Sequence, residues 1–365
     1  MKLQLAILSA IFCMVFSSQL HAQTADGVCQ DSVYGGCVFI FYHSGDNLLF
    51  MAYGDIGDGN PNDQDQYDNT WVIDIPASII VADDGLSTTV FDLDTATPKL
   101  MLGAKVKDSN NKTVVQTQVL ESLGNWATWN SQAVLIDSNR KFGLQNVLVK
   151  NVDDKLYGSF IKNGKLKTSK YVSGQWNQKS GLNTDLSNSS GEILALSPWL
   201  GLSDTLSAAV LKSSSNKGIK FRLVDPPGDG GSWDYKKNWN LNKNRGVSMV
   251  GYPETYYLIL AYTHGSNSGL VRYSNFVHDG SLHPEEWSDS VTIAASVEGY
   301  PVLTAYNDSI ILLAYTDGSN IYLLRGLQIS ETPPDYTWDL LRTLNTEAKF
   351  LAIVQYDATT LNLTP

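Results

Sequence analysis

An internal repeat limits the fold of this 365-residue chain more than any other feature of its sequence. Near the C-terminus, Ala261-Tyr-Thr-His-Gly-Ser-Asn267 matches Ala314-Tyr-Thr-Asp-Gly-Ser-Asn320 at an offset of 53 residues. The match continues without a gap to Arg272 and Arg325. A period of this length indicates an architecture in which one structural unit occurs several times along the chain.

Tryptophan residues mark the same period over most of the sequence. Five of them recur at spacings of 50, 57, 54 and 51 residues: Trp126, Trp176, Trp233, Trp287 and Trp338. Their flat rings could stack on sugars. However, a position that recurs in every unit is typical of packing between units, so we interpret these five as core residues.

The residues between the tryptophans predict β-strands. Runs such as 38–42, 48–53 and 310–315 are rich in aliphatic and aromatic residues and are bounded by Gly, Asn, Asp and Ser.

Units of about 53 residues, each with about four short strands, predict an all-β chain that forms a single β-propeller. We expect six or seven four-stranded blades and favour seven. We expect the innermost strands to begin near Cys37, Thr88, Gln145, Glu192, Val247, Pro301 and Phe350. In the six-bladed alternative, the last strands of the chain join the first blade.

In period and strand pattern the chain resembles β-propeller proteins of the sialidase-like and propeller-lectin type. Residues 228–233 (Gly-Asp-Gly-Gly-Ser-Trp) resemble the Asp-box turn of sialidase-like blades, with an Asp-to-Trp spacing that is one residue shorter. The resemblance implies either carbohydrate binding or a glycoside hydrolase or lyase. A sialidase would need an arginine triad, an Asp acid and a Tyr/Glu nucleophilic pair, and the chain beyond residue 22 has only six arginines. We therefore favour non-catalytic, lectin-like binding of a glycan or surface glycopolymer, and keep a sialidase-fold hydrolase or lyase and an envelope protein-interaction scaffold as alternatives.

The N-terminus predicts export. A positive Met1-Lys2 precedes an apolar stretch over residues 3–16, and Leu20-His21-Ala22 fits a cleavage site. We expect a signal peptide at 1–22 and a propeller domain at 23–365, in the periplasm or secreted. Beyond the signal, no apolar run is long enough for a membrane span. Because Cys29 and Cys37 are then the remaining pair in an oxidising compartment, we expect a disulfide between them.

Two sets of residues are candidates for ligand binding. The first is three tryptophans outside the repeat: Trp129, Trp199 and Trp239. The second is the repeat-equivalent pairs Tyr262 with Arg272 and Tyr315 with Arg325. An arginine fork beside a tyrosine ring can bind sugar hydroxyls or carboxylates, and the alternative for each arginine is a salt bridge at the blade edge.

An acidic segment is a candidate for a metal site. Side chains with oxygen donors stand at alternate positions, Asp58, Asn60 and Asn62, and are followed by Asp63 and Asp65. Calcium binds six to eight oxygen ligands, so this pattern predicts calcium as a cofactor. The alternative is a solvated loop in a chain of net charge −11. This charge also repels phosphate backbones, so we expect no nucleic-acid partner.

Overall fold

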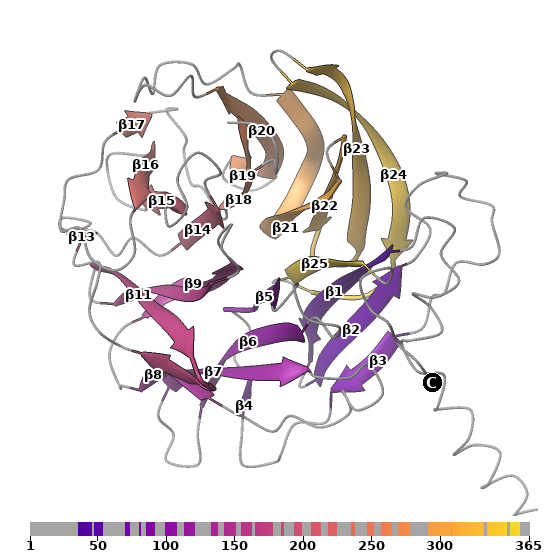
Figure 1. The fold of residues 1–365 in the computed structure, drawn as a ribbon. Coiled ribbons are helices and arrows are strands. Elements are labelled where there is room, and N and C mark those ends of the chain that lie inside the picture. The colour runs from indigo at the N-terminus through magenta and orange to yellow at the C-terminus, as the bar shows by residue number, and fades with distance from the viewer. Residues whose placement is uncertain are drawn as a thin grey trace, which may run out of the picture.

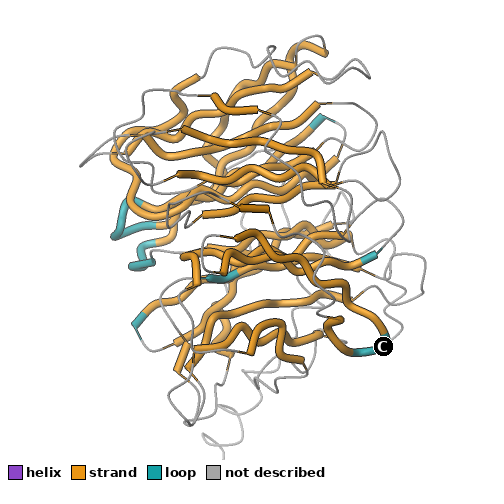
Figure 2. The backbone as a smooth tube through the Cα atoms, turned by 90° about the vertical axis from the view of Figure 1, so that its left-hand side faces the viewer, coloured by secondary structure: helices purple, strands orange, loops and turns teal. Residues whose placement is uncertain are grey.

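The structure is a computed structural model. It describes the following residues: 36–45, 47–53, 70–73, 80–81, 85–91, 99–107, 113–120, 133–137, 142–150, 155–162, 165–177, 184–185, 193–198, 206–212, 218–224, 235–237, 247–251, 257–264, 269–277, 291–307, 309–331, 334–348 and 351–357. These residues form strands and short loops, as Figure 2 shows, and include no helix. The all-β prediction is therefore confirmed for the described part of the chain. It contains no helix that could cross a membrane.

The strands form five antiparallel sheets. The first contains β25 (Leu351–Asp357), β1 (Gly36–Ser44), β2 (Asn47–Tyr53) and β3 (Thr70–Ile73), in that order. In the second, β5 (Ser87–Phe91) and β4 (Ile80–Val81) pair with β6 (Lys99–Lys107), which is followed by β7 (Thr113–Leu120) and β8 (Ala133–Asp137). The third contains β9 (Phe142–Lys150), β10 (Leu156–Lys162) and β11 (Lys165–Val172), with β12 (Gln175–Asn177) and β13 (Thr184–Asp185) paired to β11.

The remaining two sheets complete the described fold. The fourth contains β14 (Ile193–Pro198), β15 (Leu206–Lys212), β16 (Gly218–Val224) and β17 (Tyr235–Lys237). The fifth has seven strands in sequence order: β18 (Val247–Gly251), β19 (Tyr257–His264), β20 (Gly269–Val277), β21 (Val291–Asn307), β22 (Ile310–Thr316), β23 (Ile321–Glu331) and β24 (Pro334–Leu344).

The sheets are arranged around a common centre (Figure 1). The strands nearest the centre are β25, β5, β9, β14, β18 and β21. Each contacts the next in this order, and β21 contacts β25, so the contacts between inner strands close into a ring. Strand β1, which the sequence suggested as an innermost strand near Cys37, is instead the second strand of its sheet.

Strand β21 explains why one sheet has seven strands. Its Val297 pairs with Gly269 of β20, whereas the following Glu298 pairs with Thr316 of β22. The 17-residue strand is thus the outer strand of one four-stranded unit and, after this point, the inner strand of the next. Positive φ angles of 63° at Ser296 and 89° at Gly299 mark the change of partner.

The core lies between neighbouring sheets. Leu312 and Ala314 of β22 pack with Val38, Ile40 and Ile353 of the first sheet, among others. On the opposite face of β22, Ile311, Leu313 and Tyr315 pack with residues of β19, β21, β23 and β24. Because β22 is covered on both faces, it reads as a continuous apolar run in the sequence rather than as an alternating one.

Candidate functional site

One end of the seven-stranded sheet gathers polar groups, and we call this end the turn face. It contains the four-residue turn 317–320 that joins β22 to β23, which we call the β22–β23 turn. The ends of β22 and β24 lie at the same end of the sheet, on either side of the start of β23, because Thr316 pairs with Ile321 and Ile321 pairs with Leu344. The buried Thr316 hydroxyl donates a hydrogen bond to the carbonyl of Ala348, at 2.8 Å. The turn is therefore tied to the connection between β24 and β25.

Asp317 organises the β22–β23 turn. Its backbone N–H donates to the carbonyl of Asn320 at 3.2 Å. Its Oδ1 accepts hydrogen bonds from the backbone N–H groups of Ser319 (2.9 Å) and Asn320 (2.7 Å). This is the arrangement for which Asp is favoured at the first position of a turn. Gly318 has φ +95°, which an L side chain rarely adopts, so glycine is the residue this turn requires.

Two tyrosines extend this network, and we call Tyr315, Asp317, Asn320 and Tyr322 the turn cluster. The rings of Tyr315 and Tyr322 are stacked, with centroids 4.9 Å apart. The Tyr322 hydroxyl donates to Asp317 Oδ2 at 2.7 Å, and Asn320 Nδ2 donates to the same oxygen at 3.2 Å. These contacts satisfy both oxygens of the Asp317 carboxylate.

The network shifts the pKa values of its acidic groups. Burial alone would raise the pKa of Asp317, but hydrogen bonds from Tyr322, Ser319 and Asn320 outweigh it and lower the pKa to about 2. Burial, reinforced by Tyr322 and Asp317, raises the pKa of Tyr315 to about 12. The hydrogen bond to Asp317, followed by burial, raises the pKa of Tyr322. Near pH 7 the cluster therefore holds one carboxylate and two neutral hydroxyls.

These protonation states suit binding rather than proton transfer. A general acid needs a raised carboxyl pKa, and a tyrosine nucleophile needs a lowered one. Asp317 and the two tyrosines are shifted in the opposite directions. By contrast, the exposed Ser319 hydroxyl forms no hydrogen bond, and the Asn320 carboxamide oxygen accepts none, within the described residues. Both groups can therefore form a further hydrogen bond.

The lowered pKa of Asp317 predicts a pH-dependent stability. Because the folded-state pKa lies near 2 and the ordinary value is 3.8, the carboxylate stabilises the fold above about pH 4 and loses this effect as the pH falls to about 2. Asp317→Asn should cost about 1 kcal/mol at pH 7, because the hydrogen bonds lose their charge assistance at a partly exposed site. Urea unfolding at a series of pH values should show this difference shrink to nothing between pH 4 and pH 2.

Tyr322→Phe provides a matched variant for this prediction. It keeps the stacked ring and removes the hydroxyl that bonds Asp317 Oδ2. The pH range over which the Asp317 carboxylate loses its stabilising effect should then move upward, towards the ordinary pKa of a carboxyl group. A difference between wild type and Asp317→Asn that stays constant down to pH 2 would show that the hydrogen bonds do not hold the carboxylate ionised.

The structure does not bring Tyr315 and Arg325 together. Tyr315 pairs with Tyr322, whereas Arg325 pairs with Leu312, which packs towards the first sheet. Residues on opposite faces of a strand alternate, so Arg325 and Tyr315 lie on opposite faces of this sheet. Arg325 is buried, and its Nη2 lies 3.2 Å from Oδ2 of Asp339 on β24. This ion pair is the alternative to ligand binding that the sequence left open.

Arg272 and Arg325 also differ in strand register. Arg272 pairs with the buried Tyr262 across β19 and β20. Four residues separate Thr316 from its partner Ile321, but five separate His264 from its partner Leu270. The two hairpins therefore pair differently, although their sequences match without a gap.

Two of the repeating tryptophans pack between four-stranded units. Trp176 of β12 is 8% exposed, and its Nε1 donates to Thr117 Oγ1 of β7, in the neighbouring sheet, at 2.8 Å. Trp338 of β24 packs against a cluster that includes Ile259 and Ala261 of β19. Both placements agree with a packing role. The other predicted positions lie outside the residues whose side chains the structure describes: Trp126, Trp129, Trp199, Trp233, Trp239, Trp287, Arg272, Cys29, Cys37, Asp58, Asn60, Asn62, Asp63 and Asp65.

Sequence reasoning missed Asp317, Asn320 and Tyr322 as a group. The first two belong to the repeated Ala-Tyr-Thr-x-Gly-Ser-Asn segment, whose recurrence indicates a structural repeat but no binding site. Asp317 and Tyr322 replace His264 and Gly269 of the preceding repeat. These two differences between the repeats are the feature of the sequence that could have indicated the turn cluster.

Comparisons with known proteins bear on the fold. No protein family matches the sequence, and no curated protein matches it. Among solved structures, the Hadza microbial sialidase Hz136 aligns with 78% of this chain and 61% of its own length, at 10% identity and a TM-score of 0.50. The BP39L lectin from Burkholderia pseudomallei aligns over 83% of this chain and 82% of its own, at 12% identity and a TM-score of 0.48.

A fungal lectin from Aleuria aurantia, described as a six-bladed β-propeller with a novel mode of fucose recognition, aligns over 74% of this chain and 81% of its own. Its identity is 12% and its TM-score 0.46. Of these three structures, the sialidase reaches a TM-score of 0.50, and the chain is similar to it in fold. At these identities the likeness concerns the fold and not the ligand.

Proposed function

We propose that this protein is an exported, non-catalytic propeller that binds a glycan or surface glycopolymer. The observation that carries the proposal is the β22–β23 turn, where the Asn320 carboxamide nitrogen lies 3.4 Å from the hydroxyl of Tyr322, whose ring is stacked on Tyr315, and the adjacent Ser319 is exposed. Hydrogen-bonding groups next to aromatic rings match the alternation of hydroxyls and apolar faces on a sugar. The Gly-Ser-Asn sequence recurs at 265–267, which supports more than one weak site and binding through multivalency.

We infer six blades for the propeller. Three observations support this count. Six inner strands each contact the next around the ring, β25 pairs with β1, and the shared strand β21 divides the seven-stranded sheet into two four-stranded units. A ring closed by its last strand also leaves no open inner edge.

Export, the disulfide and the calcium site are further parts of the proposal. Cleavage after Ala22 would release a chain in an oxidising compartment, where Cys29 and Cys37 can pair. Residues 58–65 would supply carboxylate and carboxamide oxygens to calcium. Mass spectrometry of the exported protein tests the first two together, because it reads both the new N-terminus and the loss of two hydrogens on disulfide formation.

A glycan array probed with residues 23–365 tests the binding function. We expect binding to a limited set of glycans, and about fivefold weaker binding after Ser319→Ala, because this removes one neutral hydrogen bond from the turn. Ser330→Ala is the matched control, since Ser330 is also exposed and lies at the opposite end of β23. Turnover of chromogenic glycosides without array binding would instead favour the glycoside hydrolase alternative.

A further inference from the structure

The turn face carries negative charge from strand β21 and from the β22–β23 turn. Glu298 of β21 is exposed and pairs with Thr316. Its Oε2 lies so close to Gly318 that a Cβ atom there would be 2.7 Å from it. The carboxylate therefore lies against the β22–β23 turn, next to Ser319. Asp317 adds a second carboxylate within the same turn.

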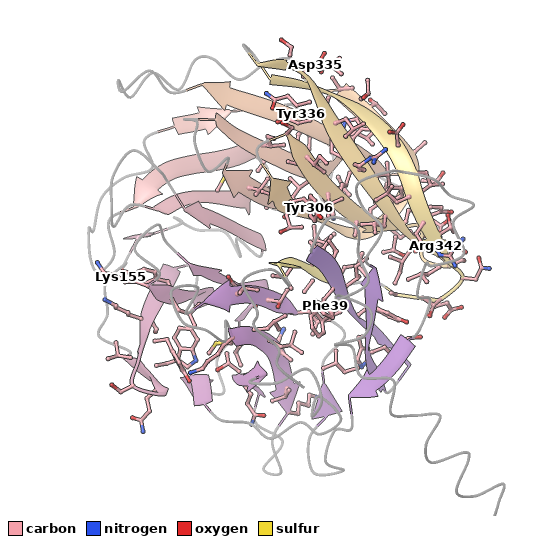
Figure 3. All side chains as sticks on the ribbon, turned by 45° about the vertical axis from the view of Figure 1, so that its right-hand side comes forward. Phe39, Lys155, Tyr306, Asp335, Tyr336 and Arg342 are labelled. Atoms are coloured by element: carbon pink, nitrogen blue, oxygen red, sulfur yellow. The ribbon has the colours of Figure 1, made fainter. Side chains whose placement is uncertain are left out.

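The described cations of this half of the sheet do not offset these carboxylates. Arg325 lies on the opposite face from Tyr315 and is paired with Asp339. Arg342 belongs to β24, the outermost strand, as Figure 3 shows. Three strand spacings separate β24 from β21, the strand of Glu298, which is about 14 Å and exceeds the Debye length of about 8 Å at physiological ionic strength. Arg342 also pairs with Leu323, which packs on the face of the sheet opposite Tyr315. The net charge of the whole chain, −11, has the same sign as the turn face.

We propose that the turn face takes uncharged or amine-bearing glycans and excludes carboxylated ones. This inference rests on the proposed glycan-binding function and names the class of ligand for the same site. A ligand carboxylate about 5 Å from the Glu298 carboxylate would lose about fourfold in affinity even at the dielectric constant of water. Glu298 is therefore a specificity-determining residue, because it is exposed and lies against the groups that would bind the sugar.

The test uses matched glycans that differ only in a carboxylate. Galactoside and galacturonide, and glucoside and glucuronide, are displayed on one array and probed with residues 23–365 and with two variants. Glu298→Gln removes the charge at the turn. Asp335→Asn removes one charge of the same sign at the opposite end of the same half-sheet, where Asp335 pairs with Ser330 (Figure 3).

The wild type should bind the neutral member of at least one pair at least fourfold more tightly than the carboxylated member. Glu298→Gln should narrow this ratio about fourfold, and Asp335→Asn should leave it unchanged. Tighter binding of the carboxylated member would overturn the inference while leaving the glycan-binding function in place. An equal effect of the two variants would overturn the local role of Glu298. Binding to no glycan would refute the proposed function, and the inference with it.

Discussion

A chain that ends at Ala348 should fail to form the native ring. This truncation removes β25, whose seven residues from Leu351 to Asp357 pair with β1. It also removes four buried side chains, Leu351, Ala352, Ile353 and Val354. Their lost burial amounts to about 6 kcal/mol, which is comparable with the whole stability of many domains. Thermal unfolding followed by circular dichroism should show no cooperative transition, or a melting temperature lowered by more than about 15 °C.

A chain that ends at Asp357 is the control, because it keeps all of β25. It should melt like the full-length protein. If the chain that ends at Ala348 also melts cooperatively and within a few degrees of the full length, the pairing of β25 with β1 does not hold the fold together.

Trp176→Ala should be the most damaging single substitution among the repeating tryptophans whose side chains are described. Trp176 is buried between two sheets, contacts Tyr171 at a centroid distance of 5.0 Å, and donates its indole N–H to Thr117. Truncating a buried large side chain of this kind costs about 3–5 kcal/mol. Urea denaturation should show the loss as a lower midpoint with an unchanged slope.

Trp176→Phe separates packing from hydrogen bonding at this position. This variant keeps most of the apolar volume and removes the donor to Thr117, so it should destabilise the fold less than Trp176→Ala. Because Trp176→Phe and Thr117→Val remove the same hydrogen bond, their losses of stability should be non-additive by about 1 kcal/mol. A loss below 1 kcal/mol for Trp176→Ala would contradict the interpretation of the repeating tryptophans as packing residues between blades.

Much of the fold was predictable because the repeat and the strand pattern are local properties of the sequence. Runs such as 310–315 indicated strands, and these residues lie in β22. The role of β21 was not predictable. Its change of partner between Val297 and Glu298 depends on which neighbouring strands are present, and this is set by tertiary packing.

The candidate site was less accessible from sequence, for a physical reason. The gap-free match suggested that Tyr315 and Arg325 form one surface, as Tyr262 and Arg272 would in the preceding repeat. Arg272 pairs with Tyr262, whereas Arg325 pairs with Leu312, three residues before the equivalent Tyr315, and a shift of register by an odd number of residues reverses the face on which a side chain lies. The period in the sequence does not record this difference.

Isothermal titration of residues 23–365 with the best glycan from the array, followed by mass spectrometry of the recovered glycan, tests the central claim most directly. We predict saturable binding that is weakened by Ser319→Ala and unaffected by Ser330→Ala, with the glycan recovered intact. Consumption of the glycan, or no saturable heat with any glycan, would contradict a non-catalytic glycan-binding propeller.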